Sequence, residues 1–522
     1  MEAALRTDWD VIVMGGALAG AATALQLRRK NPQLRILILE RSTQFKRRVG
    51  ESTVEISALF LGRVLGLTDH LLEQHLPKQG MRFWFANDRA RALDQCSETG
   101  PRYNVRLPGY QVDRAVLDEH VLAVAVGEGA VAERGVRIRH VQLAEGAAQT
   151  VSWQDAAGRA HETTARWVVD ASGVAALLAR QEGWLVTNRE HPTATCWSRW
   201  RGVRSLDGRE LAGKYPAWAN RVKGLRSTAT NHLTGRGWWA WIIPLKGGDV
   251  SIGVVYDQRL TELPPGPNLG ARLRTMLCTH PVGRELLAEA AWTEGDVHFR
   301  RHLAYSSTKY ATDGAVTVGD AAAFMDPFYS PGMDWVAFTT SAAVNLVHES
   351  FRGRPVAPRV ARHNEQFARC YARWFRALYL NKYYYMGDFD LMTLAFRLDL
   401  GLYYLGVVTL PFRHGHHLLE KPPFSHPRTE WAYRVMAFYN RRFAAIAESR
   451  HRRGVFGRHN DRRFFGFTSY EFNRRLPLRL AGLFCLWLGL EVREGWRTWW
   501  SPAPAPEAMP SGLGAAPVPG QS

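Results

Sequence analysis

Cysteine is scarce in this sequence of 522 residues: only five occur, and they lie far apart. No C-x-x-C pair is present, so the sequence suggests neither a disulfide framework nor a cysteine zinc site. A reducing cytoplasm fits this cysteine use. A leader with a charged and then an apolar segment is also missing, since a strand-like run begins almost at once. We therefore expect a cytoplasmic protein. The five cysteines are Cys96, Cys196, Cys278, Cys370 and Cys485.

Long hydrophobic runs are missing as well. The longest uncharged apolar runs, Leu400–Phe412 and Leu480–Leu490, are shorter than the roughly 20 residues that a membrane-spanning helix needs. Their lengths are typical of core helices. Arginines and aromatic residues nearby support a second interpretation, in which these runs lie against a membrane or line a tunnel for an apolar substrate.

Acidic residues are too few to balance the basic ones: 48 Asp and Glu against 67 Lys and Arg give a net charge of +19. Such an excess indicates nucleic acid, an anionic membrane surface or an acidic partner. Many arginines fall within residues 441–475, where no nucleic-acid-binding signature accompanies them, so we expect no nucleic acid as partner. A solvated basic face, an acidic acyl-carrier protein and an anionic membrane surface stay open as explanations.

Two further segments are not expected to form a functional site. His414, His416 and His417 lack a carboxylate or cysteine at ligand spacing, so we expect a polar loop there and no metal site. Residues 501–522 are rich in proline, alanine and glycine, and we expect a disordered tail. The full sequence is 46% hydrophobic, and the chain is long enough for two or three structural units with a large core.

The first 40 residues carry a pattern of strand, glycine-rich turn, helix and strand. The strands are expected at Val11–Met14 and Arg35–Leu39, and Glu40, 20 residues beyond Gly20, can accept a hydrogen bond from a ribose 2′-hydroxyl. Ala17 replaces the second glycine of G-x-G-x-x-G, and its methyl group is a small obstruction where the backbone would approach a pyrophosphate. The pattern predicts a dinucleotide site but does not separate FAD from NAD. The turn residues are Gly15, Gly16, Ala17 and Gly20.

Two later segments favour FAD. An apolar strand at Trp167–Val169 is followed by a tight turn that begins at Asp170 and can bring backbone close to a nucleotide. In "GDAAAFMDPFYSPGMDW", Gly319–Trp335, a strand delivers Asp320 to the start of a helix. An acidic side chain there can hydrogen-bond a ribityl chain, and a helix N-terminus can stabilise negative charge on a reduced flavin.

In this order, the motifs resemble the FAD-dependent monooxygenases and reductases with the glutathione-reductase-like nucleotide fold, over residues 8–345. The resemblance implies an α/β fold, with an FAD-binding domain and an interleaved substrate-binding sheet at 1–345. The aromatic and arginine-rich composition of residues 346–500 is expected to give a helical domain, which the tail follows. The resemblance also implies FAD contacts beyond the glycine-rich turn and Glu40. These are Arg41, Ser52, Arg114, Gly319, Asp320, Pro327, Gly332 and Met333.

Two stretches narrow the resemblance to the flavin-dependent, or tryptophan, halogenases. They are "VGEST" (Val49–Thr53) and "WWAWIIP" (Trp238–Pro244), which meets the W-x-W-x-I-P motif of that family. The resemblance assigns Trp239 and Trp241 to the catalytic site, where tryptophans beside the flavin exclude water and block direct access of the substrate. Their spacing alone also fits a strand with aromatic side chains packed into a core.

The resemblance further implies a lysine that directs or carries the halogenating species, and Lys78 stands in the matching region after "GEST". An ammonium can donate to hypohalous acid and polarise it, whereas a neutral amine can be chlorinated. Lys78 follows Pro77 and precedes an apolar strand at Met81–Phe85, so we expect it at a strand entrance. The alternative is a surface lysine.

A halide site is implied in the turn at Ser330-Pro331-Gly332, where such halogenases use backbone N–H groups. Proline has no N–H, which leaves the N–H of Gly332 and the hydroxyl of Ser330 as donors. One missing donor costs on the order of 1–3 kcal/mol, enough to weaken halide binding roughly ten- to a hundredfold. Tyr329 replaces the glutamate of tryptophan-specific enzymes and speaks against free tryptophan as substrate.

The leading interpretation is an FAD-dependent halogenase that uses halide, oxygen and FADH2 from a separate flavin reductase. Its substrate is an electron-rich phenolic, pyrrolic or polyene-linked compound, either free or bound to a carrier protein. The alternative is an FAD-dependent monooxygenase or dehydrogenase without halide chemistry, in which Pro331 is no defect. A third hypothesis, a membrane- or carrier-binding protein with a vestigial flavin fold, predicts that no FAD binds.

Overall fold

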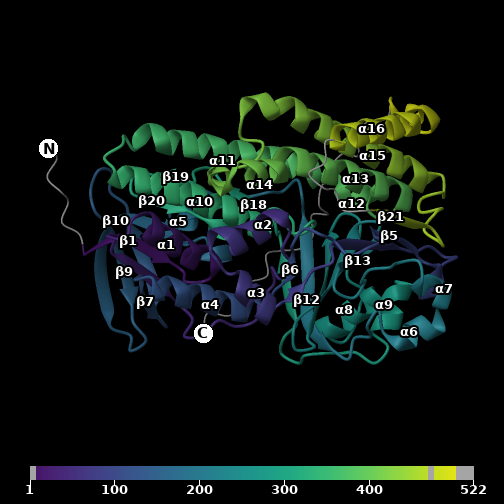
Figure 1. The fold of residues 1–522 in the computed structure, drawn as a ribbon, viewed down its shortest axis with the longest axis horizontal. Helices are drawn as coiled ribbons and strands as arrows, with labels where there is room; N and C mark the ends of the chain where they lie inside the picture. Colours follow the sequence, from purple (N-terminus) through teal and green to yellow (C-terminus); the bar gives the residue numbers. More distant parts are fainter. Residues whose placement is uncertain (1–7, 468–474, 501–522) are drawn as a thin grey trace.

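Two β-sheets lie side by side, and a layer of long helices runs along the same side of both (Figure 1). The computed structural model describes residues 8–467 and 475–500, so the expected tail at 501–522 lies outside the described residues. The helices of this layer are α10 (Gly332–Phe351), α11 (Ala357–Leu378), α13 (Phe389–Tyr403), α15 (Glu430–Arg452) and α16 (Leu476–Arg493).

The first sheet, of eight strands, contains the expected nucleotide-binding unit. Strand β1 (Trp9–Met14) is parallel to β2 (Ile36–Glu40) and to β10 (Ala160–Asp170), and α1 (Leu18–Lys30) connects β1 with β2. The last four residues of β1 are fully buried, as expected for a parallel strand covered on both faces. The predicted strands at Val11–Met14 and Arg35–Leu39 are confirmed within two residues. The strand predicted at Trp167–Val169 is the end of the longer β10.

The second sheet, of nine mostly antiparallel strands, contains the tryptophan motif. Strand β14 (Trp238–Pro244) lies between β13 (Thr230–Gly235) and β15 (Val250–Asp257), and β4 (Met81–Phe85) runs parallel to β13. Every residue of β15 is buried, because helices cover one face of the sheet and the main core covers the other. The predicted β-rich region is thereby confirmed.

The C-terminal region is helical, as predicted, but one of its apolar helices is longer than its uncharged run. Helix α13 continues through a π-helical turn (Tyr404–Val408) into α14 (Thr409–His414). This continuous helix, Phe389–His414, has the length and composition to cross a membrane, and 61% of its most apolar window is buried inside the protein. The helix is longer than the uncharged run because its first half contains the charged residues Asp390, Arg397 and Asp399. Because most of this window is buried, the helix packs as a core helix, in agreement with the first interpretation of the run.

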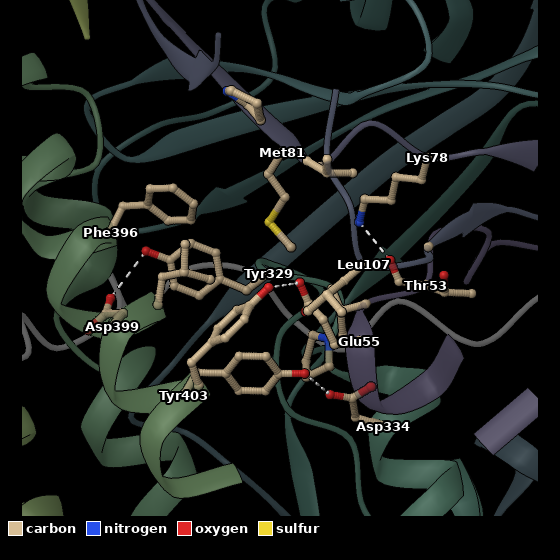
Figure 2. Close-up of a pocket in the computed structure, with 18 of the residues that line it drawn as sticks. Thr53, Glu55, Lys78, Met81, Leu107, Tyr329, Asp334, Phe396, Asp399 and Tyr403 are labelled. Atoms are coloured by element: carbon tan, nitrogen blue, oxygen red, sulfur yellow. Dashed lines mark hydrogen bonds between the residues drawn. The ribbon is translucent and has the colours of Figure 1, made fainter. Parts of the chain in front are cut away.

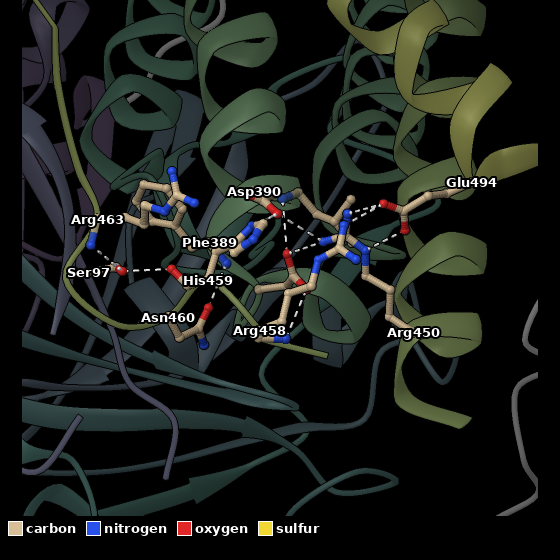
Figure 3. Close-up of polar contacts among 12 residues, drawn as sticks. Ser97, Phe389, Asp390, Arg450, Arg458, His459, Asn460, Arg463 and Glu494 are labelled. Carbon is tan, nitrogen blue, oxygen red and sulfur yellow. Dashed lines mark hydrogen bonds and ion pairs between the residues drawn. The ribbon is translucent and has the colours of Figure 1, made fainter. Parts of the chain in front are cut away.

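Several arginines of the 441–475 segment are not on a solvated basic face, contrary to one expectation. Arg450 is 1% exposed and pairs with Asp388 (2.7 Å) and Glu494 (2.9 Å). The pair with Asp388 joins α15 to the start of α13, and the pair with Glu494, shown in Figure 3, joins α15 to the segment after α16. Carboxylates that are distant in the sequence compensate these charges, so the net charge overstates the basic surface.

The chain then returns from the helices to the second sheet. Asn460 accepts from the backbone of Phe389 (2.9 Å), and Ser97 donates to the carbonyl of His459 (2.7 Å; Figure 3). Strand β21 (Phe464–Phe467) follows and pairs in parallel with β5 (Ser97–Pro101) at the sheet edge. The C-terminal region therefore contributes a strand to the sheet as well as a helical layer.

The architecture is the predicted α/β fold: a parallel nucleotide-binding sheet, a β-rich second sheet and a helical C-terminal region. Helix α10 runs from Gly332 to Phe351, so it passes through the expected domain boundary at 345/346. The division of the chain into domains stays a prediction.

Candidate active site

The glycine-rich turn brings helix α1 as close to strand β1 as backbone allows. Gly15 has a φ of +104°, and a Cβ there would lie 2.5 Å from the carbonyl oxygen of Ala171. A Cβ on Gly20 would lie 1.8 Å from the carbonyl oxygen of Gly15. Neither position tolerates a side chain. Ala17 caps α1 in an extended conformation, so its methyl group does not prevent the turn from forming.

Glu40 stabilises this turn from the end of β2. One carboxylate oxygen accepts from the N–H of Gly16 (2.7 Å), and the other accepts from the N–H of Ser42 (2.7 Å). Each oxygen retains a second lone pair for a ribose hydroxyl. The next residue, Arg41, is exposed.

Three arginines lie close enough to Asp320, at the first helical turn after β20 (Ala315–Thr317), to act on its charge. Burial raises the pKa of Asp320, while the charges of Arg114, Arg300 and Arg48 oppose this rise. Arg114 begins α4 (Arg114–Gly127) and is held by the carboxylate of Asp118 at 3.0 and 3.2 Å. The arginines, the start of α1 and the side-chain-free turn together fit a pyrophosphate-bridged dinucleotide such as FAD.

The turn before α10 contains two consecutive residues with left-handed backbone conformation. Tyr329 and Ser330 have φ values of +70° and +57°, which is unusual for residues other than glycine. The N–H of Ser330 donates to the carbonyl of Pro327 (2.9 Å), and Pro331 has no N–H. The N–H groups of Gly332 and the buried Met333 open α10 and have no partner within the helix. They are the backbone donors that this turn offers to an anion.

Lys78 lies in the short connection between β3 (Leu76–Pro77) and β4, at the predicted strand entrance. It is 4% exposed, so the surface-lysine alternative is wrong. Its ammonium donates to the carbonyl of Thr53 (2.7 Å), in the "VGEST" stretch. Burial lowers the pKa of Lys78 to about 8, although Glu55 and Asp334 act in the opposite direction.

A cavity of ≈ 120 Å³ extends from Lys78 to the turn before α10 (Figure 2). This volume is close to the roughly 150 Å³ of an engineered apolar cavity that binds benzene, so it suits a single aromatic ring. Its walls come from the β3–β4 connection, the loop around residues 105–109, α11, α13 and β21. The apolar lining includes Met81, Val105, Leu107, Trp374, Phe396, Leu400 and Phe467.

Two carboxylates with tyrosine partners line the same cavity. Asp334 accepts from the hydroxyl of Tyr403 (2.9 Å) and from the N–H of Ser57 (2.9 Å). Burial raises the pKa of Asp334 to about 7. Glu55 accepts from the hydroxyl of Tyr404 (2.6 Å). The cavity therefore has an apolar interior with proton-accepting groups at its wall.

Tyr329 belongs to a third polar group at the cavity wall. Its hydroxyl donates to Asp399 (3.1 Å), which also pairs with the buried ammonium of Lys382 (2.6 Å). Tyr439 donates to the other oxygen of Asp399 (2.6 Å). The phenol at position 329 is held in place by this network, which comes entirely from the C-terminal helices.

The two motif tryptophans lie outside the cavity lining of the described residues. Trp239 donates to Tyr383 (2.9 Å) and packs on Phe328, next to Tyr329, with ring centroids 5.1 Å apart. Trp241 donates to Ser251 (3.1 Å) and fills the space above Gly253. Both are buried, so core packing accounts for their spacing, and Trp239 also supports the turn before α10. Their catalytic assignment stays a prediction.

The remaining predicted residues are dispersed around this region. The Ser52 hydroxyl shares a hydrogen bond with Thr230 (2.8 Å) beside the "VGEST" turn. Sequence reasoning missed Glu55, Asp334, Asp399 and Tyr403 as site residues, although Glu55 and Asp334 lie within or next to quoted motifs. In the described part of the chain, no group of three or more His, Cys, Asp or Glu side chains can hold a metal ion.

Comparisons with known proteins agree with this geometry. The family model described as tryptophan halogenase matches residues 10–104 and 85–387. The flavin-dependent halogenase chlA of Dictyostelium discoideum is 27% identical over 66% of this chain and 61% of its own length. The sulochrin halogenase gedL of Aspergillus terreus is 25% identical over 66% and 63%. The chain thus spans about three fifths of these curated relatives.

Solved structures share the fold. Halogenase PltM in complex with phloroglucinol and FAD superposes with a TM-score of 0.73 at 18% identity, over 93% of this chain and 97% of that one. The chondrochloren halogenase CndH gives a TM-score of 0.58 at 22% identity, over 74% and 82%. The predicted glutathione-reductase-like FAD-binding fold is confirmed.

Proposed function

Because the chain belongs to the tryptophan halogenase family, we propose that it is an FAD-dependent enzyme that halogenates an electron-rich aromatic ring. The observation that carries this proposal is Lys78: a buried ammonium at the wall of a cavity that fits one ring. A phenolic ring is the preferred substrate, since it supplies its own activation and its hydroxyl matches the carboxylates at the wall. The solved structure with phloroglucinol, itself a phenol, supports this choice.

The nucleotide site, formed by the glycine-rich turn, Glu40 and the arginines near Asp320, would hold FAD. Gly15, Gly16 and the start of α1 would approach its pyrophosphate, Glu40 its ribose, and Arg114 and Asp320 its neighbouring polar groups. Reduced FAD, with oxygen and halide, would supply hypohalous acid. The chain has one glycine-rich nucleotide unit, at residues 11–40, so we propose that a separate reductase supplies the reduced flavin.

Lys78 would activate the halogen for transfer. Its pKa of about 8 keeps it mainly an ammonium at neutral pH, able to donate to the oxygen of hypohalous acid. The ring carbon attacks the halogen, and the halogen–oxygen bond breaks toward oxygen. Oxygen takes a proton from Lys78 and leaves as water. The apolar walls, including Met81 and Phe396, exclude bulk water that would otherwise compete for the reaction.

The ring must then lose a proton, and the cavity provides acceptors. Asp334, in its ionised form, and Glu55 both line the cavity near Lys78. Asp334 is the better positioned base, because hydrogen bonds from Tyr403 and Ser57 fix its two oxygens. Transfer from the base to the neutral amine of Lys78, directly or through water, would restore both groups.

A monooxygenase without halide chemistry is the second candidate function. One observation favours it: two positions of the turn offer no backbone donor to a halide. The N–H of Ser330 already donates to the carbonyl of Pro327, and Pro331 has no N–H. Halide binding would then depend on Gly332, Met333 and the Ser330 hydroxyl. This second candidate predicts oxidation of reduced flavin at a rate that does not depend on halide.

The test supplies purified protein with FAD, a flavin reductase, NADH, oxygen and bromide or chloride, and follows halogenation of monochlorodimedone or an electron-rich phenol. Lys78→Met is compared with wild type and with Lys309→Met, which replaces an exposed lysine. Reactions without halide, and reduced FAD without protein, are the controls. We expect halide-dependent product that Lys78→Met abolishes and Lys309→Met retains. Flavin oxidation without any halogenated product would instead support the monooxygenase.

A further inference from the structure

Helix α16 and the turn after it expose large apolar side chains on their outer side. Leu478 and Val492 are each 74% exposed, and Trp500 is 93% exposed. Single exposed apolar residues are common, but a continuous row along a helix is not. We call this row the α16 outer face. It consists of Leu478, Ala481, Cys485, Leu486, Leu488, Val492, Trp496, Trp499 and Trp500.

The helix does not need these residues for its own packing. Its inner side already buries Leu476, Leu480, Leu483 and Leu490. Leu480 approaches α13 so closely that a Cβ on Gly401 would lie 2.5 Å from its side chain. The helix is therefore apolar around most of its circumference, yet the residues that the structure describes cover only one side of it. Helices of this kind are normally buried in a protein core or in contact with lipid.

Within residues 475–500, as the structure describes them, the exposed charges all have one sign. Arg475, Arg479, Arg493 and Arg497 are exposed at the two ends of the α16 outer face. The acidic residues of the same region point inward, where Glu491 pairs with Arg442 (2.8 Å) and Glu494 pairs with Arg450 (2.9 Å). An apolar row with arginines at both ends and tryptophans at one end matches helices that lie in the headgroup region of an anionic membrane.

We propose that the α16 outer face binds an anionic lipid surface, with the helix parallel to the membrane plane. The apolar row enters the boundary between headgroups and acyl chains, and the arginines contact lipid phosphates. The buried leucines hold the helix to the protein, so it lies on the membrane without crossing it. This inference does not depend on the proposed halogenation.

The position of the α16 outer face gives membrane binding a consequence for the cavity. One side of α13 packs on α16, while Asp399, Leu400 and Tyr403 of the same helix line the cavity. Only one helix separates the proposed lipid contact from the cavity. A substrate dissolved in the membrane would thus be concentrated next to the site.

The test is sedimentation of the full chain with phosphatidylcholine vesicles, with and without phosphatidylglycerol. We expect binding only to vesicles with phosphatidylglycerol, and weaker binding at high salt. The double variant Leu478→Glu and Val492→Glu should bind about 30-fold more weakly, because each charge near an anionic surface changes partitioning about fivefold. The matched control, Val116→Glu and Val126→Glu, places the same charges at exposed valines of α4 (41% and 42% exposed) and should bind like wild type.

Three results would overturn the proposal. The first is a wild-type protein that binds neither kind of vesicle, and the second is a double variant that binds as well as the control. The third is a wild-type dimer that the double variant converts to a monomer in size-exclusion chromatography with light scattering, because a second copy of the chain would then cover the face. Since all the changed residues are exposed, far-UV circular dichroism should confirm that each variant remains folded.

Discussion

Replacing Lys78 with methionine should abolish halogenation without destabilising the protein. The fall in the Lys78 pKa from 10.5 to about 8 means that burial disfavours the charged form by about 3 kcal/mol. Methionine has a similar length and removes this cost. It also removes the donor to the Thr53 carbonyl, which costs about 1–3 kcal/mol. The net change at pH 7 is therefore a gain of about 0–2 kcal/mol in the free energy of unfolding.

The stability difference should change sign with pH. Between pH 8 and 10.5 the unfolded wild type binds more protons at Lys78 than the folded one, so its stability rises with pH in this window. Near the top of this window, at pH 10, the folded amine is neutral and still donates to Thr53, whereas methionine cannot. The variant should then be less stable than wild type by about 1–3 kcal/mol.

The assay is equilibrium urea unfolding of both proteins at pH 7 and pH 10, alongside halogenation at pH 7. We expect kcat/KM to fall by about 10²–10⁴, the contribution of a positioned proton donor. The control variant Lys309→Met should leave both quantities unchanged. A variant that is clearly less stable at pH 7, or a difference in stability that does not vary with pH, would refute the reasoning about the buried charge.

Further changes test other parts of the molecule. Lys382→Met, in contrast, should destabilise the protein by about 3–5 kcal/mol in urea unfolding, because it leaves a buried carboxylate 2.6 Å away without its ion pair; unchanged stability would contradict this. Gly20→Val should yield protein without bound FAD, read from the flavin absorbance, because its side chain would displace the Gly15 carbonyl; yellow protein would show that the turn tolerates it. Pro331→Ser supplies a backbone donor and should lower the KM for halide about tenfold, while an unchanged KM would place the halide elsewhere. Activity should rise with pH through about 7 as the raised pKa of Asp334 is passed, and Asp334→Asn should remove this rise; a variant with the wild-type pH profile would exclude Asp334 as the base.

Local sequence signals predicted the nucleotide-binding half well. The order of strand, turn and helix up to Glu40 depends on neighbouring residues, and the close contact between Gly15 and Gly20 follows from their spacing. The resemblance to halogenases directed attention to Lys78, which lies at the expected strand entrance. These features needed no knowledge of distant contacts.

The cavity was not predictable in the same way. Asp334 and Tyr403 are 69 residues apart in the sequence and meet only because the fold brings the first turn of α10 and the end of α13 to the same cavity wall. The burial of Lys78 likewise depends on segments such as residues 105–109, which carry no motif. In the sequence, Arg450 belongs to a basic stretch. Its partners Asp388 and Glu494 are far from it along the chain, so the sequence did not predict these ion pairs. Tertiary contacts decided these roles.

The pairing of β21 with β5 has a consequence for the order in which the protein is made. Phe467, at the end of β21, lines the cavity, yet it leaves the ribosome 366 residues after Pro101 of its partner strand. At about 5–20 residues per second, roughly 20–70 s pass between the two. The glycine-rich turn and its parallel strands are complete long before that. A nascent chain can thus assemble its nucleotide site while the cavity still lacks a wall, and a chain that ended just before Phe464 would keep the residues of the nucleotide site but lack Phe467 of the cavity wall.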